Sequence, residues 1–148
     1  MNFVAPNHNI GGTLEEMESK NSGSKIAVLI CCIDPRIRGT VDDAVEQELG
    51  VKCFKLTAPG ASQRLLDPVA REVMMSDVKF ALENWAEIVV LCHHGAGCAA
   101  YGDNQGQQTS DMITAAHLLR ERFSVSVVLC MQDNPEEPHL RVIGRFLA

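Results

Sequence analysis

The chain has 148 residues, of which 46% are hydrophobic and 22% are charged, as expected for one globular domain with a substantial core. Its net charge of −6 argues against a surface for nucleic acid or anionic membranes, and no apolar run reaches the roughly 18–20 residues of a membrane span. The N-terminus lacks the basic start and apolar centre of a secretory signal, so we expect a cytoplasmic protein. Its six cysteines are then expected as buried thiols, metal ligands or nucleophiles rather than as disulfides.

The chain divides into a polar N-terminal arm, residues 1–24, and a single domain, residues 25–148. The arm contains Gly11 and Gly12 and the loop-forming sequence "NSGS", so we expect at most one short helix in it, at residues 13–19.

Along the domain, apolar runs alternate with segments of helical periodicity. Continuous β-branched runs predict strands that are buried on both faces. The predicted strands are residues 25–33, 51–58, 87–94 and 125–132, with a short fifth strand in the tail. The predicted helices are residues 40–50, ended by Gly50, residues 67–85, begun by Pro68, and residues 110–123, capped by Ser110. This alternation predicts an α/β fold with a mainly parallel sheet of four to five strands, flanked by helices on both faces.

Residues that carry chemistry follow two of these strands. The stretch "LICCIDPRIR" places Cys32, Asp34 and Arg36 at alternate positions after the first strand, and "CHHGAGC" places two histidines and Cys98 after the third. In parallel sheets, ligands bind beyond the carboxyl ends of the strands. We expect the first and third strands to be neighbours, so Cys32, Cys98 and one histidine should converge.

These side chains form a ligand set suited to zinc. Two thiolates and one imidazole favour a tetrahedral Zn²⁺ site, and three protein ligands leave the fourth position open, as in catalytic sites. Asp34 would accept a hydrogen bond from whatever fills that position, and Arg36 would keep Asp34 ionised and oriented. Neighbouring strand residues point to opposite faces, so only one of His93 and His94 can reach the metal.

Each of these residues also has an ordinary explanation when it is taken alone. A cysteine at a strand end is usually a small buried hydrophobe, and an Asp-x-Arg pair is more often a salt bridge in a loop. Such explanations do not account for the gathering of all unusual residues at two strand ends that should be neighbours. The remaining cysteines and histidines are expected as structural thiols and as solvated or locally bonded imidazoles, namely Cys31, Cys53, Cys92, Cys130, His8, His117 and His139.

Two motifs resemble those of the β-class carbonic anhydrases. "CIDPR", from Cys32 to Arg36, is similar to their C-x-D-x-R motif, and "HHGAGCAAYG" is similar to their second motif, where a histidine shortly precedes a cysteine. The order of elements fits over residues 25–131. The resemblance implies reversible hydration of carbon dioxide to bicarbonate by a zinc-bound hydroxide. It also implies that the zinc ligands are Cys32, a histidine and Cys98, and that Asp34 and Arg36 form the catalytic dyad. It also implies a homodimer with the active site near the subunit boundary.

The chain departs from the family pattern in the loop before Cys98. The family usually has two residues between histidine and cysteine, whereas three separate His94 from Cys98, so the loop must bulge by one residue. Gly95 and Gly97 permit such a bulge. We assign His94 as the zinc ligand, because in relatives with two adjacent histidines the second histidine binds the metal. His93 is the alternative ligand.

Other functions remain open at this stage. Relatives with this ligand set include hydrolases of carbonyl sulfide and carbon disulfide, and a zinc module without catalytic activity would need the same ligands. Residues Cys32 to Arg38 also satisfy C-x5-R, the signature of small tyrosine phosphatases and arsenate reductases, with Asp133 as a candidate acid. Pro35 would remove one backbone N–H from such a phosphate loop and Asp34 would face the anion, so we regard this alternative as remote.

Overall fold

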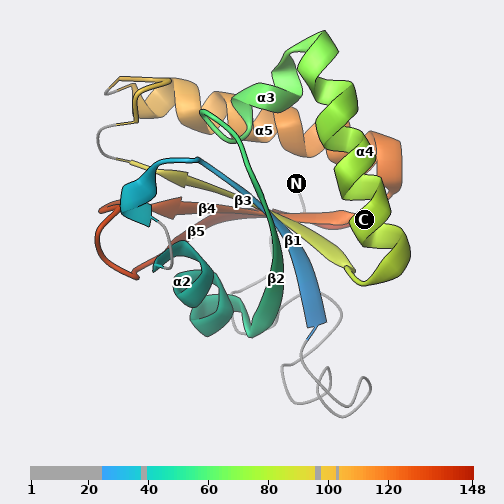
Figure 1. Ribbon diagram of the computed structural model, residues 1–148, viewed down its shortest axis with the longest axis horizontal. Helices are drawn as coiled ribbons and strands as arrows, with labels where there is room; N and C mark the ends of the chain where they lie inside the picture. The colour runs from blue at the N-terminus through green and yellow to red at the C-terminus, as the bar shows by residue number, and fades with distance from the viewer. Residues whose placement is uncertain (1–24, 38–39, 96–97, 103) are drawn as a thin grey trace.

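The computed structural model describes residues 25–37, 40–95, 98–102 and 104–148. The arm of residues 1–24, with the short helix expected in it, lies outside the described residues. In the described part, a twisted sheet has helices on both faces (Figure 1).

The sheet has five strands in the order β2-β1-β3-β4-β5. Its strands are β1 (Lys25–Cys31), β2 (Val51–Thr57), β3 (Ile88–His94), β4 (Ser126–Gln132) and β5 (Arg141–Phe146). The helical elements are η2 (Pro35–Ile37), α2 (Thr40–Leu49), α3 (Gln63–Leu66), α4 (Pro68–Asn84) and α5 (Gln105–Phe123). The first four strands are parallel and β5 is antiparallel to β4, which confirms the predicted mainly parallel α/β sheet.

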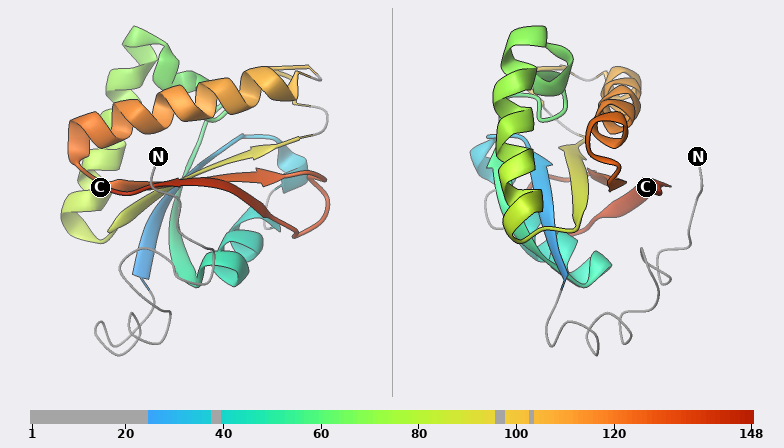
Figure 2. Two further views of the ribbon diagram at one scale, coloured as in Figure 1. Left: turned by 180° about the vertical axis from the view of Figure 1, so that it is seen from behind. Right: turned by 90° about the vertical axis from the view of Figure 1, so that its right-hand side faces the viewer.

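Two hydrophobic cores explain why the central strands are apolar on both sides. One core lies between the sheet and α3, α4 and α5, and the other lies between the sheet and α2 (Figure 2). All seven residues of β3 and all seven of β4 are buried, which is the burial that continuous apolar runs predict. None of the described helices is both long enough and apolar enough to cross a membrane.

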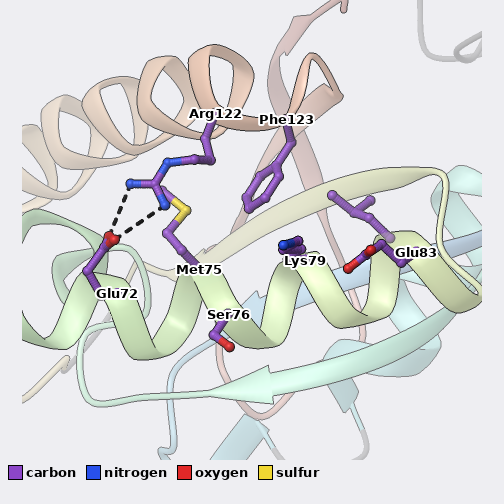
Figure 3. A pocket seen from close by; sticks show the side chains of 8 residues that line it. Glu72, Met75, Ser76, Lys79, Glu83, Arg122 and Phe123 are labelled. Atoms are coloured by element: carbon purple, nitrogen blue, oxygen red, sulfur yellow. Dashed lines mark hydrogen bonds and ion pairs between the residues drawn. The ribbon is translucent and has the colours of Figure 1, made fainter.

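Helices α4 and α5 lie side by side on one face and are joined at the surface by an ion pair. Arg122 Nη2 lies 3.1 Å from Glu72 Oε2 at the rim of a groove of about 670 Å³ (Figure 3). Because a helix rises about 1.5 Å per residue, Arg122 lies about 25 Å along α5 from its first residue, Gln105. The groove is therefore remote from the strand ends at which Gln105 lies.

The predicted start of the last helix is wrong. The sequence indicated a helix from Ser110, but α5 begins at Gln105. The cap is Asn104, whose side chain accepts a hydrogen bond from the Gln107 N–H at 2.9 Å. Gly106 disfavours a helix locally, and the cap together with contacts to the sheet compensates for this cost.

One strand boundary and one short helix also differ from the prediction. β1 ends at Cys31 rather than at residue 33, because the chain turns into η2 after Cys32. The four-residue helix α3 was not predicted. The helices predicted at residues 40–50 and 67–85 are confirmed as α2 and α4.

Candidate metal centre

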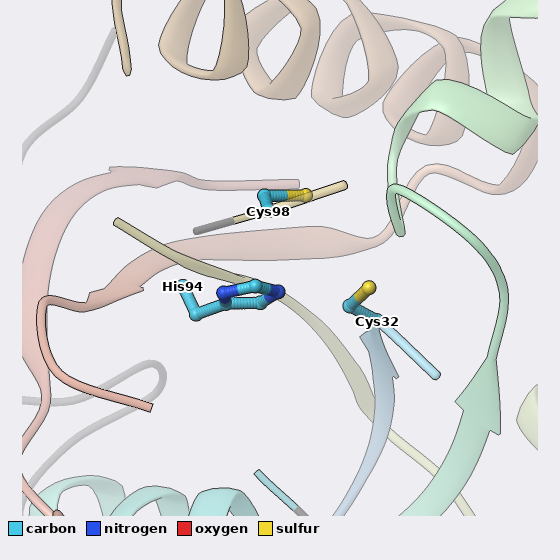
Figure 4. Close-up of side chains that lie close together, drawn as sticks. All are labelled: Cys32, His94 and Cys98. Atoms are coloured by element: carbon cyan, nitrogen blue, oxygen red, sulfur yellow. The ribbon is translucent and has the colours of Figure 1, made fainter. Parts of the chain in front are cut away.

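Three segments bring Cys32, His94 and Cys98 together. Cys32 directly follows β1, His94 ends the neighbouring parallel strand β3, and Cys98 lies in the turn beyond it. One ligand atom from each residue lies within 4.8 Å of the others, and in Figure 4 the His94 ring turns one nitrogen toward Cys32. The convergence that strand adjacency predicted is thus present in the structure.

The donor set and its spacing fit a zinc ion. With a Zn–S bond of about 2.3 Å and tetrahedral angles, two ligating sulfurs would lie about 3.8 Å apart, so small adjustments would suffice. All three side chains are buried, with exposed fractions of 9% for Cys32, 1% for His94 and 2% for Cys98. Among the described residues, no fourth cysteine, histidine or acidic residue joins the group. The three residues can hold a metal and leave a coordination position for a small molecule.

The two adjacent histidines have different surroundings. The His93 Nε2 atom accepts a hydrogen bond from the Ser62 N–H at 3.2 Å, so its Nδ1 atom is the donor to Gln108 Oε1 at 3.1 Å. Burial lowers the pKa of His93 to about 4, which keeps the ring neutral. Both ring nitrogens of His93 are therefore engaged away from Cys32. The geometry favours His94 over His93, although its role as a ligand stays a prediction.

The two cysteines near His94 differ in acidity. Burial alone would raise the pKa of Cys32, but hydrogen bonds from His94 and from the backbone N–H groups of Gly60 and Asp34 lower it to about 7. Burial raises the pKa of Cys98, and the nearby Cys32 sulfur raises it further. Cys32 is thus the more readily ionised of the two thiols, which a metal would bind as thiolates.

The turn after β2 contributes a residue that the sequence did not single out. Gly60 has a φ of +71°, and a Cβ atom added there would lie 2.9 Å from the Ala100 Cβ atom. A side chain at this position would therefore push the turn away from the Cys98 segment. Glycine allows the backbone N–H of residue 60 to reach the Cys32 sulfur while the two turns stay in contact.

Asp34 and Arg36 form the pair that the sequence predicted. Arg36 Nε lies 3.1 Å from each carboxylate oxygen, and the Arg36 backbone N–H donates to Asp34 Oδ1 at 2.9 Å. The hydrogen bonds from Arg36 lower the pKa of Asp34 to about 2. Asp34 Oδ2 also lies 3.6 Å from His94 Nε2. An ionised carboxylate thus stands at the edge of the candidate metal centre, while its catalytic role stays a prediction.

A cavity of about 310 Å³ opens beside Cys32 and Asp34. The apolar side chains of Ile37 and Val41 form part of its wall, and Lys55 also lines it. The Lys55 ammonium is paired with Asp42 at 3.1 Å. The cavity therefore offers space for a small molecule between an apolar wall and the Asp34 carboxylate.

The remaining cysteines behave as structural thiols. All six cysteines of the chain are free, and burial raises the pKa of Cys31 and of Cys53 to about 12. Burial also raises the pKa values of Cys92 and Cys130, which face each other on β3 and β4. These four thiols are protonated at neutral pH and are poor nucleophiles.

In the described part of the chain, Asp133 does not offer the protonated acid that the phosphatase alternative needs. Asp133 is paired with Arg141 at 2.8 Å, and this contact lowers the pKa of Asp133, so its carboxyl group is ionised at neutral pH. Pro35 begins the 3-10 turn η2, and Arg38 lies outside the described residues.

Of the histidines expected to be solvated, His117 and His139 are exposed, and His8 lies outside the described residues.

Comparison with known proteins gives one match. The family model described as "Putative carbonic anhydrase" matches residues 22–135, more than three quarters of the chain, and this range includes every residue of the candidate metal centre. The search of curated proteins and the search of solved structures each gave no match.

Proposed function

The chain belongs to the carbonic anhydrase-like family that this model describes, and we propose that it is a zinc enzyme that reversibly hydrates carbon dioxide to bicarbonate. The observation that carries the proposal is the convergence of Cys32, His94 and Cys98 beside an ionised Asp34. Cys32, His94 and Cys98 would hold the metal. In carbonic anhydrases, a bound zinc lowers the pKa of its coordinated water to about 7, a value general to that class.

Asp34 would orient the attacking oxygen. Because the Arg36 hydrogen bonds keep the Asp34 carboxyl ionised far below neutral pH, its Oδ2 atom can accept a hydrogen bond but has no proton to donate. An oxygen that donates a hydrogen bond to Oδ2 has its lone pair fixed relative to the carboxylate. Arg36 would also restrain Asp34 from turning onto the metal, because it binds both carboxylate oxygens.

The cavity beside Cys32 suits a small neutral substrate. Carbon dioxide is apolar overall and needs no charged partner, so the apolar wall of Ile37 and Val41 can accommodate it. Bicarbonate carries a charge, and that wall offers it no hydrogen bond. The apolar side of the cavity would therefore favour the neutral substrate, whereas Lys55, which lines the same cavity and is paired with Asp42, is the cationic group available to bicarbonate.

We also propose that the protein is a homodimer, as the family resemblance implies. Four apolar side chains of the α4 region are exposed, namely Val69, Val73, Phe80 and Trp85, and β2 lies at an edge of the sheet. Light scattering after size exclusion should give the dimer mass for the wild type, and a monomer at all concentrations would contradict the proposal. Cytoplasmic location stays a prediction.

Stopped-flow carbon dioxide hydration, measured with zinc content by mass spectrometry, tests the proposed reaction. We expect about one zinc per chain and hydration that is lost after removal of the metal and restored by added zinc. Full zinc without hydration across a pH series would contradict the activity. Turnover of carbonyl sulfide or carbon disulfide would then identify a hydrolase on the same site, and inactivity on all three would indicate a zinc module without catalysis.

A further inference from the structure

One face of α5 carries a row of polar side chains directed toward the candidate metal centre. We call this the α5 polar row, and its members, spaced three residues apart, are Gln105, Gln108 and Asp111. Gln108 is fully buried and Asp111 is 7% exposed. Buried polar side chains cost free energy unless they are hydrogen-bonded, and an apolar side chain would pack at these positions without that cost. Gln108 and Asp111 are therefore expected to have a role beyond packing, whereas Gln105 is exposed and belongs to the row through its hydrogen bond to Gly95.

The first two members hold the end of β3 on both sides of His94. Gln105 Nε2 donates a hydrogen bond to the Gly95 carbonyl oxygen at 3.1 Å. Gln108 Oε1 accepts one from His93 Nδ1 at 3.1 Å. The residues before and after His94 are thus both tied to α5, which leaves the His94 backbone little freedom to shift or rotate.

The third member holds the turn that carries Cys98. Asp111 Oδ2 accepts a hydrogen bond from the Tyr101 hydroxyl at 2.8 Å, and Asp111 Oδ1 accepts one from Gln107 Nε2 at 2.8 Å. The backbone N–H groups of Tyr101 and Gly102 donate to the Cys98 carbonyl oxygen at 3.1 and 2.7 Å. Anchoring the Tyr101 side chain on α5 therefore fixes the turn that sets the position of the Cys98 sulfur.

We propose that the α5 polar row and Tyr101 are positioning residues, which fix His94 and Cys98 in the arrangement that binds the metal. This inference rests on the proposed zinc site, and it adds residues from an element that contributes no ligand. Gln105 holds Gly95, directly after His94, and Asp111 holds Tyr101, in the turn that carries Cys98. Contacts of α5 thus restrain the chain on both sides of the segment that joins the two ligands.

The test uses the full chain with two variants and a matched control. Tyr101→Phe removes only the hydroxyl that binds Asp111, and Asp111→Asn weakens the acceptor with little change of shape. Thr114→Ala is the control, because Thr114 is exposed and the one bond of its hydroxyl within the described residues goes to the Ser110 carbonyl of the same helix, at 3.2 Å. Zinc affinity is measured by competition with a chromophoric chelator, and the cobalt-substituted protein is examined by absorption spectroscopy. Unfolding of the metal-free protein is recorded in parallel.

We expect both variants to bind zinc at least about 10-fold more weakly than the wild type, the size of effect typical of groups that orient metal ligands. The cobalt spectrum should change in its thiolate-to-metal and d–d bands, and Thr114→Ala should match the wild type. Affinities within twofold of the wild type and unchanged cobalt spectra in both variants would overturn the inference, even if the metal-free variants unfold more easily. Failure of the wild type itself to bind zinc or cobalt would instead overturn the proposed metal site, and the inference with it.

Discussion

Arg36 binds both carboxylate oxygens of Asp34 through its side chain and one of them through its backbone N–H. The Asp34 side chain is 13% exposed and the Arg36 side chain 41%, so the pair lies at the boundary between the candidate metal centre and solvent. This arrangement presents a fixed, ionised acceptor 3.6 Å from His94 Nε2 without placing Asp34 among the three converging residues.

Asp34→Asn should separate metal binding from catalysis. We expect zinc to stay bound, because Cys32, His94 and Cys98 are unchanged, and hydration of carbon dioxide to fall about 10²–10³-fold, as is typical when one positioned hydrogen-bonding group is removed. Stopped-flow hydration and zinc content are measured on the same samples. An Asp34→Asn variant as active as the wild type would leave the metal site intact but exclude Asp34 from catalysis.

Arg36→Ala should also retain zinc and lose most activity. Without the guanidinium, the pKa of Asp34 is expected to rise from about 2 toward its ordinary value, and the carboxylate is free to rotate. The cobalt-substituted variant would reveal a carboxylate that has moved onto the metal as a changed d–d spectrum. If Arg36→Ala is as active as the wild type, the Arg36 side chain is not needed to hold Asp34 in place.

The adjacent histidines should respond differently to substitution. His94→Ala should lose most bound zinc, because it removes the only imidazole of the converging group. His93→Gln should keep most of its zinc, because the His93 ring nitrogens bind Ser62 and Gln108 and not the metal, although loss of the contact to Gln108 should weaken the affinity. Zinc content after gel filtration is the measurement. The reverse pattern would show that the residue facing the metal has been assigned wrongly.

The buried His93 ring should make stability depend on pH. Its pKa is lowered from 6.5 to about 4 in the folded protein, so the unfolded chain binds more protons between these values. The stability that the neutral ring contributes is fully present above about pH 6.5 and is lost as the pH falls toward 4. Between pH 7 and pH 5, the metal-free wild type should lose about 2 kcal/mol more unfolding free energy than His93→Gln, as measured by urea denaturation. Equal losses in both proteins would contradict this contribution.

Two glycine substitutions should have opposite effects. Gly60→Ala places a Cβ atom 2.9 Å from Ala100 at a φ of +71°, so we expect a loss of at least about 1–2 kcal/mol in unfolding free energy and weaker zinc binding. Gly106→Ala is the control, because its Cβ atom would meet only Asn104 Oδ1, at 3.6 Å, inside α5. There we expect a gain of about 0.5–1 kcal/mol. Thermal and urea unfolding of both variants check the pair, and a Gly60→Ala protein as stable as the wild type would contradict the close-contact argument.

Local signals predicted most of the fold. The apolar runs of β3 and β4 predicted strands buried on both faces, and Gly50, which has a φ of +66°, marked the end of α2. The start of α5 was not predictable in this way. Gly106 and the neighbouring glutamines resemble a loop, and the contacts that favour a helix there, such as Gln108 with His93, join residues far apart in the sequence.

The candidate site was predictable where side chain chemistry combined with strand order. Cys32, His94 and Cys98 converge because β1 and β3 are parallel neighbours, which the alternation of strands and helices indicated. The role of Gly60 could not be predicted from the sequence, because it acts through its backbone N–H, whose direction depends on the conformation of the turn. The α5 polar row could not be predicted either, because its contacts, like those that favour the start of α5, join residues far apart in the sequence.

X-ray absorption at the zinc edge of the purified wild type tests the central claim most directly, because it reports which atoms surround the metal. The account predicts about one zinc per chain, with two sulfur neighbours at about 2.3 Å and two nitrogen or oxygen neighbours at about 2.0–2.1 Å. The sulfur contribution should decrease in Cys32→Ser and in Cys98→Ser, to the extent that these variants retain zinc. A protein without zinc, a metal surrounded only by nitrogen and oxygen, or a wild-type spectrum unchanged in both variants would contradict it.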